Sequence, residues 1–124
     1  MNGRYLLDTH ILLWALNNDP RLSETHRAIF LSNQQVVISA ISILEIAIKK
    51  SLGKLTLAVD VVSLLHERGI SILAVTETHA ARVEFLPMHH GDPFDRVLIA
   101  QAQIEGMTLV TADANIKRYD VLLA

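Results

Sequence analysis

The chain of 124 residues contains no cysteine, which excludes both a disulfide framework and a thiolate metal site. Aromatic residues make up only 5% of the sequence and charged residues 19%, whereas hydrophobic residues reach 51%. The formal net charge of −2 also argues against a protein that grips phosphates through a broad basic face. Either nucleic acid is not the substrate, or acidic residues gather where a metal cation offsets their charge.

Long apolar runs are absent as well. The longest, VVISAISILEIAI, is too short to cross a bilayer and contains Glu45. The N-terminal segment is interrupted by Asp8 and His10 and lacks the small-residue cleavage site of a signal peptide. We therefore expect a cytoplasmic protein without membrane contact. The apolar excess is more than a small domain can bury, so part of the surface is expected to serve self-association or a partner.

Short aliphatic runs alternate with helical patterns along the chain. Strands are expected at residues 4–8, 36–39, 70–75, 107–113 and 121–124. Helices are expected at residues 10–17, 24–32, 40–52, 60–68, 77–86 and 93–105, with a helical turn at 114–118. The strands show no period-2 alternation, as expected when helices cover both faces of a sheet. The pattern predicts a single α/β domain over residues 1–124, with a parallel sheet between helices.

Two aspartates stand three residues apart in HHGDPFDRVLIAQA, where a helix is expected to begin. Asp92 has the position of an N-cap, and Pro93 that of the first helical residue. Asp95 can be explained as the acid of a capping box, or as a charge that suits the helix dipole. It also shares a helix face with Leu98 and Ile99, so its carboxylate is expected to point inward.

Two further acids follow expected strands. Asp8 lies at the carboxyl end of the first strand, and Asp113 at the carboxyl end of TLVTAD. The carboxyl ends of parallel strands lie along one edge of a sheet, which is where ligands bind. Asp8 and Asp113 are therefore expected on the same edge. The alternative is that each aspartate only caps a helix or forms a turn.

Glu45 lies in the apolar part of its helix. On a wheel of 100° per residue it falls within the arc formed by Ile41, Leu44, Ile48 and Leu52. A carboxylate on an apolar face is costly unless it is protonated, paired or bound to a cation. Its helix follows the strand at 36–39, so Glu45 is expected about one turn from that strand's end. A salt bridge with a Lys or Arg is the alternative to a metal ion.

Four acids on four elements are thus expected at one edge of the sheet. Crowded carboxylates raise one another's pKa, and a divalent cation relieves the repulsion. Oxygen ligands without Cys favour Mg²⁺ or Mn²⁺ over Zn²⁺. Of the six histidines, His89 and His90 are adjacent and the others are scattered, so none is expected to bind metal. Carboxylate-held Mg²⁺ suits phosphodiester hydrolysis, and it would attract a phosphodiester without a basic surface.

Three more residues are candidates for outer contacts. Thr9 and Thr111 flank the strand-end acids, and their hydroxyls could orient water around a metal. Arg96 follows Asp95 and could meet a substrate phosphate. The alternatives are that the threonines cap helices or fit strands, and that Arg96 is a solvated helix residue.

Four blocks of the chain together resemble the PIN domain, specifically the VapC-type toxin ribonucleases of bacterial toxin–antitoxin pairs. The blocks are LLDTHILLW, ISAISILEIAIKKSLGKL, HHGDPFDRVLIAQA and TLVTADANI, which cover nearly the whole chain in order. The resemblance implies a three-layer α/β/α fold with a five-stranded parallel sheet. It implies RNA cleavage dependent on Mg²⁺ or Mn²⁺, with Asp8, Glu45, Asp95 and Asp113 as the catalytic and metal-binding acids. It also implies a homodimer, and a cognate antitoxin whose tail lies across the active site.

Three other classes of protein compete with this interpretation. A metal-dependent phosphatase with an aspartyl nucleophile needs a second Asp two residues after the first, where this chain has His10. A receiver-like signalling domain does not explain the inward Glu45. A non-catalytic interaction module would use the acids structurally, and metal-dependent activity would distinguish it from a nuclease. For the nuclease, attack by water predicts 5′-phosphate and 3′-hydroxyl ends.

Overall fold

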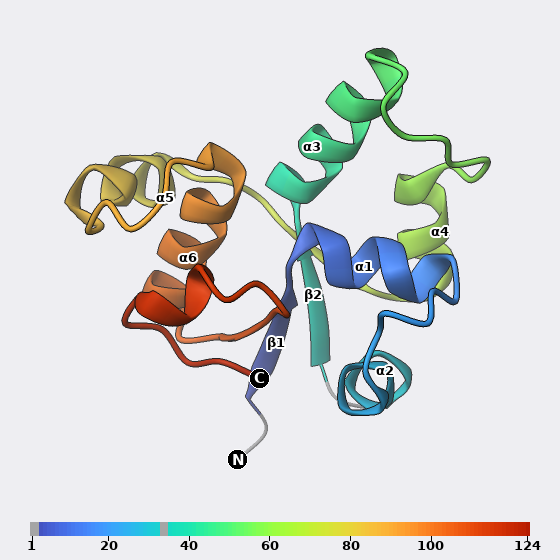
Figure 1. The fold of residues 1–124 in the computed structure, drawn as a ribbon, viewed down its shortest axis with the longest axis horizontal. Helices are drawn as coiled ribbons and strands as arrows, with labels where there is room; N and C mark the ends of the chain where they lie inside the picture. The colour runs from blue at the N-terminus through green and yellow to red at the C-terminus, as the bar shows by residue number, and fades with distance from the viewer. Residues whose placement is uncertain (1–2, 33–34) are drawn as a thin grey trace.

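The computed structural model describes residues 3–32 and 35–124, in which strands and helices alternate (Figure 1). The strands are β1 (Arg4–Leu7), β2 (Gln35–Ser39), β3 (Ser71–Leu73) and β4 (Thr108–Val110). The α-helices are α1 (Thr9–Leu16), α2 (Glu24–Leu31), α3 (Ala40–Ser51), α4 (Val61–Glu67), α5 (Glu77–Arg82) and α6 (Pro93–Glu105). Two 3₁₀ turns are η1 (Val83–Phe85) and η2 (Ile116–Arg118). The helix expected at 77–86 is thus divided into α5 and η1.

The sheet is parallel throughout, with the strand order β3-β2-β1-β4. The prediction of five strands was wrong. In the described residues, the segment at 121–124 makes a single isolated bridge, between Leu123 and Leu109. The N–H of Leu109 donates to the carbonyl of Leu122 at 2.8 Å, so the pairing begins as in a strand. It continues with the N–H of Ala124, which donates to the carbonyl of Leu109 at 3.0 Å, and the N–H of Thr111, which donates to the carbonyl of Ala124 at 3.3 Å. The segment therefore lies along β4, but its single bridge is too short to form a fifth strand.

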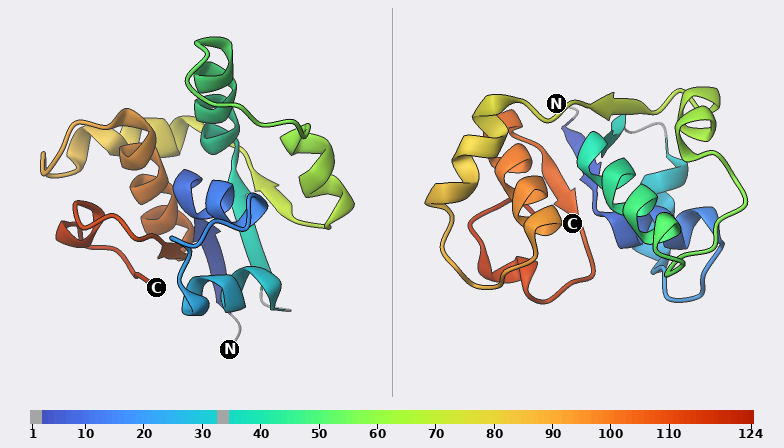
Figure 2. Two further views of the ribbon diagram at one scale, coloured as in Figure 1. Left: turned by 45° about the vertical axis from the view of Figure 1, so that its right-hand side comes forward. Right: turned by 90° about the horizontal axis from the view of Figure 1, so that it is seen from above.

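The sheet separates two hydrophobic cores, which gives the three layers that were predicted (Figure 2). Leu6 of β1 is in register with Leu109 of β4, and both side chains belong to the core formed with α6 and η1. The next pair in register, Leu7 and Val110, belongs to the opposite core, formed with α1, α3 and α4. Successive strand residues point to opposite faces, so both faces of a fully covered sheet are apolar.

Helix starts follow the capping signals in the sequence. Asp8 caps α1, Ser23 caps α2, and Asp92 caps α6 with Pro93 in its first turn. In each case the side-chain oxygen accepts a hydrogen bond from a backbone N–H that has no partner within the helix. The predicted capping role of Asp92 is therefore confirmed. No helix among residues 3–32 and 35–124 is long and apolar enough to cross a membrane.

The strand order places two of the acids side by side. The chain runs outward from β1 to β2 to β3, and then returns to add β4 on the other side of β1. The direction of winding therefore reverses between β1 and β4, and such a switch point is where open parallel sheets bind ligands. Asp8 directly follows β1, and Asp113 follows β4 by three residues. The fold thus brings both to the carboxyl edge of the sheet.

Gly106 ends α6 in the left-handed conformation, with φ of 66°, and a Cβ added to it would meet no atom within 4 Å. We expect Gly106→Ala to lower the free energy of unfolding by about 1 kcal/mol, because a Cβ is strained at positive φ even where nothing contacts it. Urea denaturation measures this change. Gly91→Ala is the matched control, since Gly91 has equal space without a positive φ. Equal effects of the two substitutions would contradict the prediction.

Candidate active site

Asp8 is the most buried of the strand-end acids. It caps α1: its Oδ1 accepts from the N–H of Ile11 at 2.9 Å, while its Oδ2 accepts from the hydroxyl of Thr111. Only 3% of the residue is exposed. Burial raises the pKa of the carboxyl, although both hydrogen bonds act in the opposite direction. The nearby charge of Asp113 raises it further. Ionised Asp8 is thus a buried anion that a cation would stabilise.

Asp113 lies in the turn that follows β4. Its backbone N–H donates to the hydroxyl oxygen of Thr111 at 3.0 Å, and its own Oδ1 accepts from the N–H of Asn115 at 2.9 Å. Thr111 therefore connects the two acids, because the same hydroxyl donates to Asp8 and accepts from the backbone of Asp113. This side chain orients Asp8 and also shapes the turn that carries Asp113.

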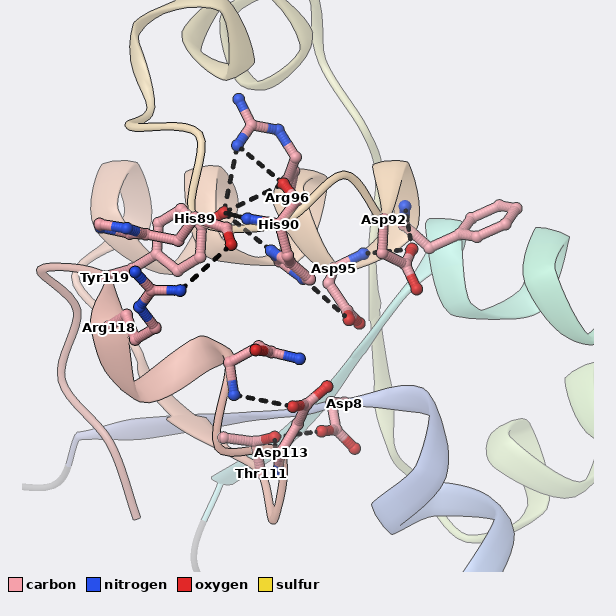
Figure 3. A network of polar contacts seen from close by, with 12 residues as sticks. Asp8, His89, His90, Asp92, Asp95, Arg96, Thr111, Asp113, Arg118 and Tyr119 are labelled. Atoms are coloured by element: carbon pink, nitrogen blue, oxygen red, sulfur yellow. Dashed lines mark hydrogen bonds and ion pairs between the residues drawn. The ribbon is translucent and has the colours of Figure 1, made fainter.

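Asp95 approaches the other two acids from the first turn of α6 (Figure 3). Its carboxylate is directed toward Asp8 and Asp113, and 14% of its side chain is exposed. The pKa of Asp95 is raised to about 6, chiefly because burial removes water from the carboxylate. The charge of Asp92 is the next cause, and those of Asp8 and Asp113 add to it. The inward orientation expected for Asp95 is confirmed.

Glu45 is buried, with 4% of the residue exposed, but the helical wheel placed the wrong arc of α3 inside. The buried positions are Ser42, Glu45 and Ile46, whereas Leu44 and Leu52 are exposed. The helix extends beyond the end of β2 (Figure 1), so its apolar arc has no sheet to pack against. A salt bridge is present, as one of the two possibilities required: Nζ of Lys49, one turn along the same helix, lies 2.9 Å from Oε2 of Glu45. It engages only one of the two carboxylate oxygens.

The second carboxylate oxygen of Glu45 takes no part in this ion pair. Its Oε1 is buried and has no hydrogen-bond partner in the described part of the chain. Thr9, the first residue of α1, donates to the hydroxyl of Ser42 at 2.9 Å, so Thr9 holds α1 against the start of α3. Glu45 follows Ser42 by three residues and therefore lies on the same face of α3, one turn further on. Thr9 thus sets the position of the helix that carries Glu45.

Arg96 turns away from the acids, in contrast to the substrate contact considered for it. It is 6% exposed, and its guanidinium donates to the hydroxyl of Tyr119 at 3.1 Å. The remaining acceptors are backbone carbonyls of the segment before α6, at Val83, Leu86, Pro87 and His90. The solvated alternative is wrong as well, because the side chain is buried. Arg96 holds this segment against α6.

His90 is the site residue that the sequence analysis missed. Its Nε2 lies 3.3 Å from Oδ2 of Asp95, and its Nδ1 lies 2.8 Å from the hydroxyl of Tyr119 (Figure 3). The segment of residues 86–92 has no regular secondary structure, so no periodicity assigns its side chains to a face. The only signal in the sequence is that His90 immediately precedes the capping segment of α6.

The donor set suits a hard divalent cation. The structure brings Asp8, Asp95 and Asp113 together, and they offer only oxygen, which Mg²⁺ and Mn²⁺ prefer. Glu45 adds a carboxylate on α3, but its charge is not among those that act on Asp8 or Asp95. Burial and mutual repulsion raise the pKa of Asp8 and Asp95, and the unpartnered Oε1 of Glu45 is an available ligand. Among the described residues, no three His, Asp or Glu side chains already stand close enough together to ligate one ion. The residues fit the ion in kind, and movements of their side chains would have to complete the site.

The chain belongs to the PIN domain family, whose model matches residues 5–122. The family predicted from the four sequence blocks is therefore confirmed. Among characterised proteins, the chain is similar to Ribonuclease VapC22 of Mycobacterium tuberculosis (strain ATCC 25618 / H37Rv). The two are 30% identical over 117 residues, which is 92% of this chain and 90% of the relative.

Solved structures share the fold. VapBC2 from Rickettsia felis, bound to a DNA fragment from its promoter, contains a chain with a TM-score of 0.70 and 19% identity. That match covers 98% of this chain and 97% of the other. A toxin–antitoxin complex from Klebsiella pneumoniae contains a chain with a TM-score of 0.60 and 22% identity, over 88% and 86% of the two chains. At these identities the likeness establishes the fold.

The raised pKa of Asp95 makes the stability of the metal-free protein depend on pH. The ionised carboxylate is disfavoured in the fold, so stability is lost as pH rises from about 4 through about 6. In EDTA, we expect Asp95→Asn to raise the free energy of unfolding by about 2 kcal/mol at pH 7.5, and by far less at pH 4. Urea titrations at both pH values measure this. The exposed Asp120 gives the control Asp120→Asn, and a less stable Asp95→Asn at pH 7.5 would refute the prediction.

The buried guanidinium of Arg96 gives a second prediction. We expect Arg96→Lys to lower the free energy of unfolding by about 2–3 kcal/mol. The two terminal nitrogens of the guanidinium donate to different backbone carbonyls, and the single ammonium of a lysine cannot reach them all. Arg118→Lys, at an exposed arginine, should change it by less than about 0.5 kcal/mol. Thermal or urea unfolding compares the two. Unchanged stability in Arg96→Lys would show that the arginine is not structural.

Proposed function

We propose that this protein is a metal-dependent endoribonuclease of the VapC type, the toxin of a toxin–antitoxin pair, with residues 1–124 as one PIN domain. The observation that carries the proposal is the convergence of Asp8, Asp95 and Asp113 at the switch point of the sheet. Burial there raises the pKa of Asp8 and of Asp95. Membership in the PIN family and the likeness to Ribonuclease VapC22 supply the reaction class, which is hydrolysis of RNA phosphodiester bonds.

In this proposal Asp8, Asp95 and Asp113 hold Mg²⁺ or Mn²⁺, and Oε1 of Glu45 contributes to the same site. The bound ion would bind a phosphate oxygen, lower the pKa of water and stabilise charge on the leaving oxygen. The chain's own residues set up this site beforehand. Thr111 fixes one oxygen of Asp8, and the N–H of Ile11 fixes the other. Lys49 neutralises one oxygen of Glu45, which limits the negative charge that the fold must bear.

The proposed partners are an RNA substrate, a cognate antitoxin and a second copy of this chain. The solved relative from Klebsiella pneumoniae is a toxin–antitoxin complex, which supports the antitoxin. The apolar excess of the sequence lies partly on the surface: Leu44, Ile48 and Leu52 line one side of α3, and Leu52 is 62% exposed. Phe85 and Met88 are exposed in the segment between α5 and α6. Such side chains suit protein interfaces. Since the substrate is RNA, the proposed place of action is the cytoplasm.

The competing functions have less support. A phosphatase with an aspartyl nucleophile lacks its second aspartate, since His10 stands two residues after Asp8. A non-catalytic PIN module would have no reason to keep three buried or half-buried carboxylates together against their repulsion. Loss of one or more acids is what we would expect in a module without activity, and all four are present here.

The test is cleavage of a mixed RNA pool that includes tRNA and ribosomal RNA, in Mg²⁺, in Mn²⁺ and in EDTA. We expect cleavage with either metal and none in EDTA. We expect a loss of about 10²–10³-fold in Asp8→Asn, because a proposed ligand of the ion that would stabilise the reacting charge is removed. Asp120→Asn, which changes an exposed aspartate on the surface, should cleave like the wild type.

The ends of the products distinguish the mechanism. Attack by water leaves 5′-phosphate and 3′-hydroxyl ends, whereas attack by the ribose 2′-hydroxyl leaves 2′,3′-cyclic phosphate. Cyclic ends, or equal cleavage in EDTA, would contradict a metal-dependent hydrolase. If tRNA and ribosomal RNA stayed intact under every condition, the ribonuclease proposal would be wrong. The phosphatase or the interaction module would then be the better explanation.

A further inference from the structure

Four side chains form a continuous line of hydrogen bonds that ends on Asp95 (Figure 3). Nη1 of Arg96 lies 3.1 Å from the hydroxyl of Tyr119, and that hydroxyl lies 2.8 Å from Nδ1 of His90. Nε2 of His90 lies 3.3 Å from Oδ2 of Asp95. Tyr119 and Arg96 are buried, and the side chains of His90 and Asp95 are each 14% exposed.

The chemistry of the first group fixes the direction of every bond in this line. A guanidinium has only donors, so the Tyr119 hydroxyl accepts from Arg96. The backbone N–H of His90 points to the same hydroxyl oxygen at 3.3 Å, which makes a second donor to it. The hydroxyl hydrogen is then left to donate. Nδ1 of His90 at 2.8 Å is a nearer acceptor than the carbonyl of His90 at 3.4 Å.

The tautomer of the imidazole follows from this direction. An Nδ1 that accepts a hydrogen bond carries no hydrogen, so the neutral ring carries its hydrogen on Nε2. Nε2–H then donates to Oδ2 of Asp95. With its tautomer reversed, the ring would turn a lone pair toward the carboxylate and repel it. Arg96 and Tyr119 therefore select the form of His90 that holds Asp95.

We propose that His90 is a positioning residue, which fixes one oxygen of Asp95 so that the carboxylate faces Asp8 and Asp113, and that Tyr119 and Arg96 set its tautomer. This inference rests on the proposed function, because it gives His90 a role at the same metal site. A carboxylate held by one oxygen has lost a rotation before the ion arrives. Removing such a partner of a metal ligand typically costs about 10–100-fold in metal affinity.

Calorimetric titration with Mn²⁺ in the absence of RNA tests the role. We expect His90→Leu to weaken binding by about 10–100-fold. His90→Gln should recover most of that loss, because its amide N–H reaches Asp95 much as Nε2 does. His89→Leu is the matched control, since the His89 ring makes a T-shaped contact with Tyr119 and no hydrogen bond to Asp95 in the described chain. Its affinity for Mn²⁺ should equal that of the wild type.

¹⁵N NMR of the histidine rings in the metal-free protein tests the inferred tautomer independently of metal binding. We expect the wild-type His90 ring to show a protonated Nε2 and a bare Nδ1. In Tyr119→Phe, which keeps the buried ring and removes the hydroxyl, we expect a mixture of tautomers and a part of the loss in Mn²⁺ affinity. This variant also replaces His90→Leu as the test if the leucine protein does not fold.

Each failure has a different signature. A hydrogen on Nδ1 in the wild type would overturn the inferred direction of the bonds. A wild type that binds Mn²⁺ and cleaves RNA, with His90→Leu equal to it in both, would overturn the positioning role and leave the proposed function standing. A wild type that shows the expected tautomer but binds no Mn²⁺ would overturn the metal site, and with it any role of His90 toward a metal.

Discussion

The crowding of carboxylates at one edge of a parallel sheet is the constraint on which the rest of this structure depends. Parallel strands must end together, so the residues after β1 and β4 meet whether or not their charges favour it. Burial then raises the pKa of Asp8, and burial with neighbouring charge raises that of Asp95. Much of the polar structure nearby opposes this cost: a helix N-terminus, the hydroxyl of Thr111 and the ring of His90 each meet a carboxylate oxygen.

The sequence predicted those parts of the site that follow from regular structure. Asp8 and Asp113 follow strands, and Asp92 precedes a proline at a helix start. The general rules for the carboxyl edge of parallel sheets and for helix starts therefore locate all three. The buried face of α3 and the expected fifth strand were predicted wrongly, because they depend on contacts beyond the local sequence. Which arc of a helix is buried depends on where the helix meets the sheet, and α3 extends past the end of β2. The segment at 121–124 does pair with β4, but through one bridge, and four apolar residues in the sequence cannot distinguish a strand from a single bridge.

Contacts between distant residues account for what the sequence could not predict. Arg96 and Tyr119 are 23 residues apart, and His90 and Tyr119 are 29 apart. Neither pair belongs to one helix or to paired strands, so no period connects them. Arg96 stands next to Asp95 in the sequence, yet adjacent residues of a helix point about 100° apart. That rotation places the carboxylate of Asp95 in the site. It places the guanidinium of Arg96 among the backbone carbonyls of the segment before α6.

The two sides of α3 are held by different contacts. Glu45 and Ser42 face inward, where Thr9 and Lys49 hold them, while Leu44, Ile48 and Leu52 remain uncovered on the other side. Selection can therefore act on the two sets independently. Duplicated copies of such a gene could exchange these outer aliphatic residues for other side chains and so acquire new protein partners, with no change to the acid on the inner side. One helix would then allow partners to diverge while the chemistry stays the same.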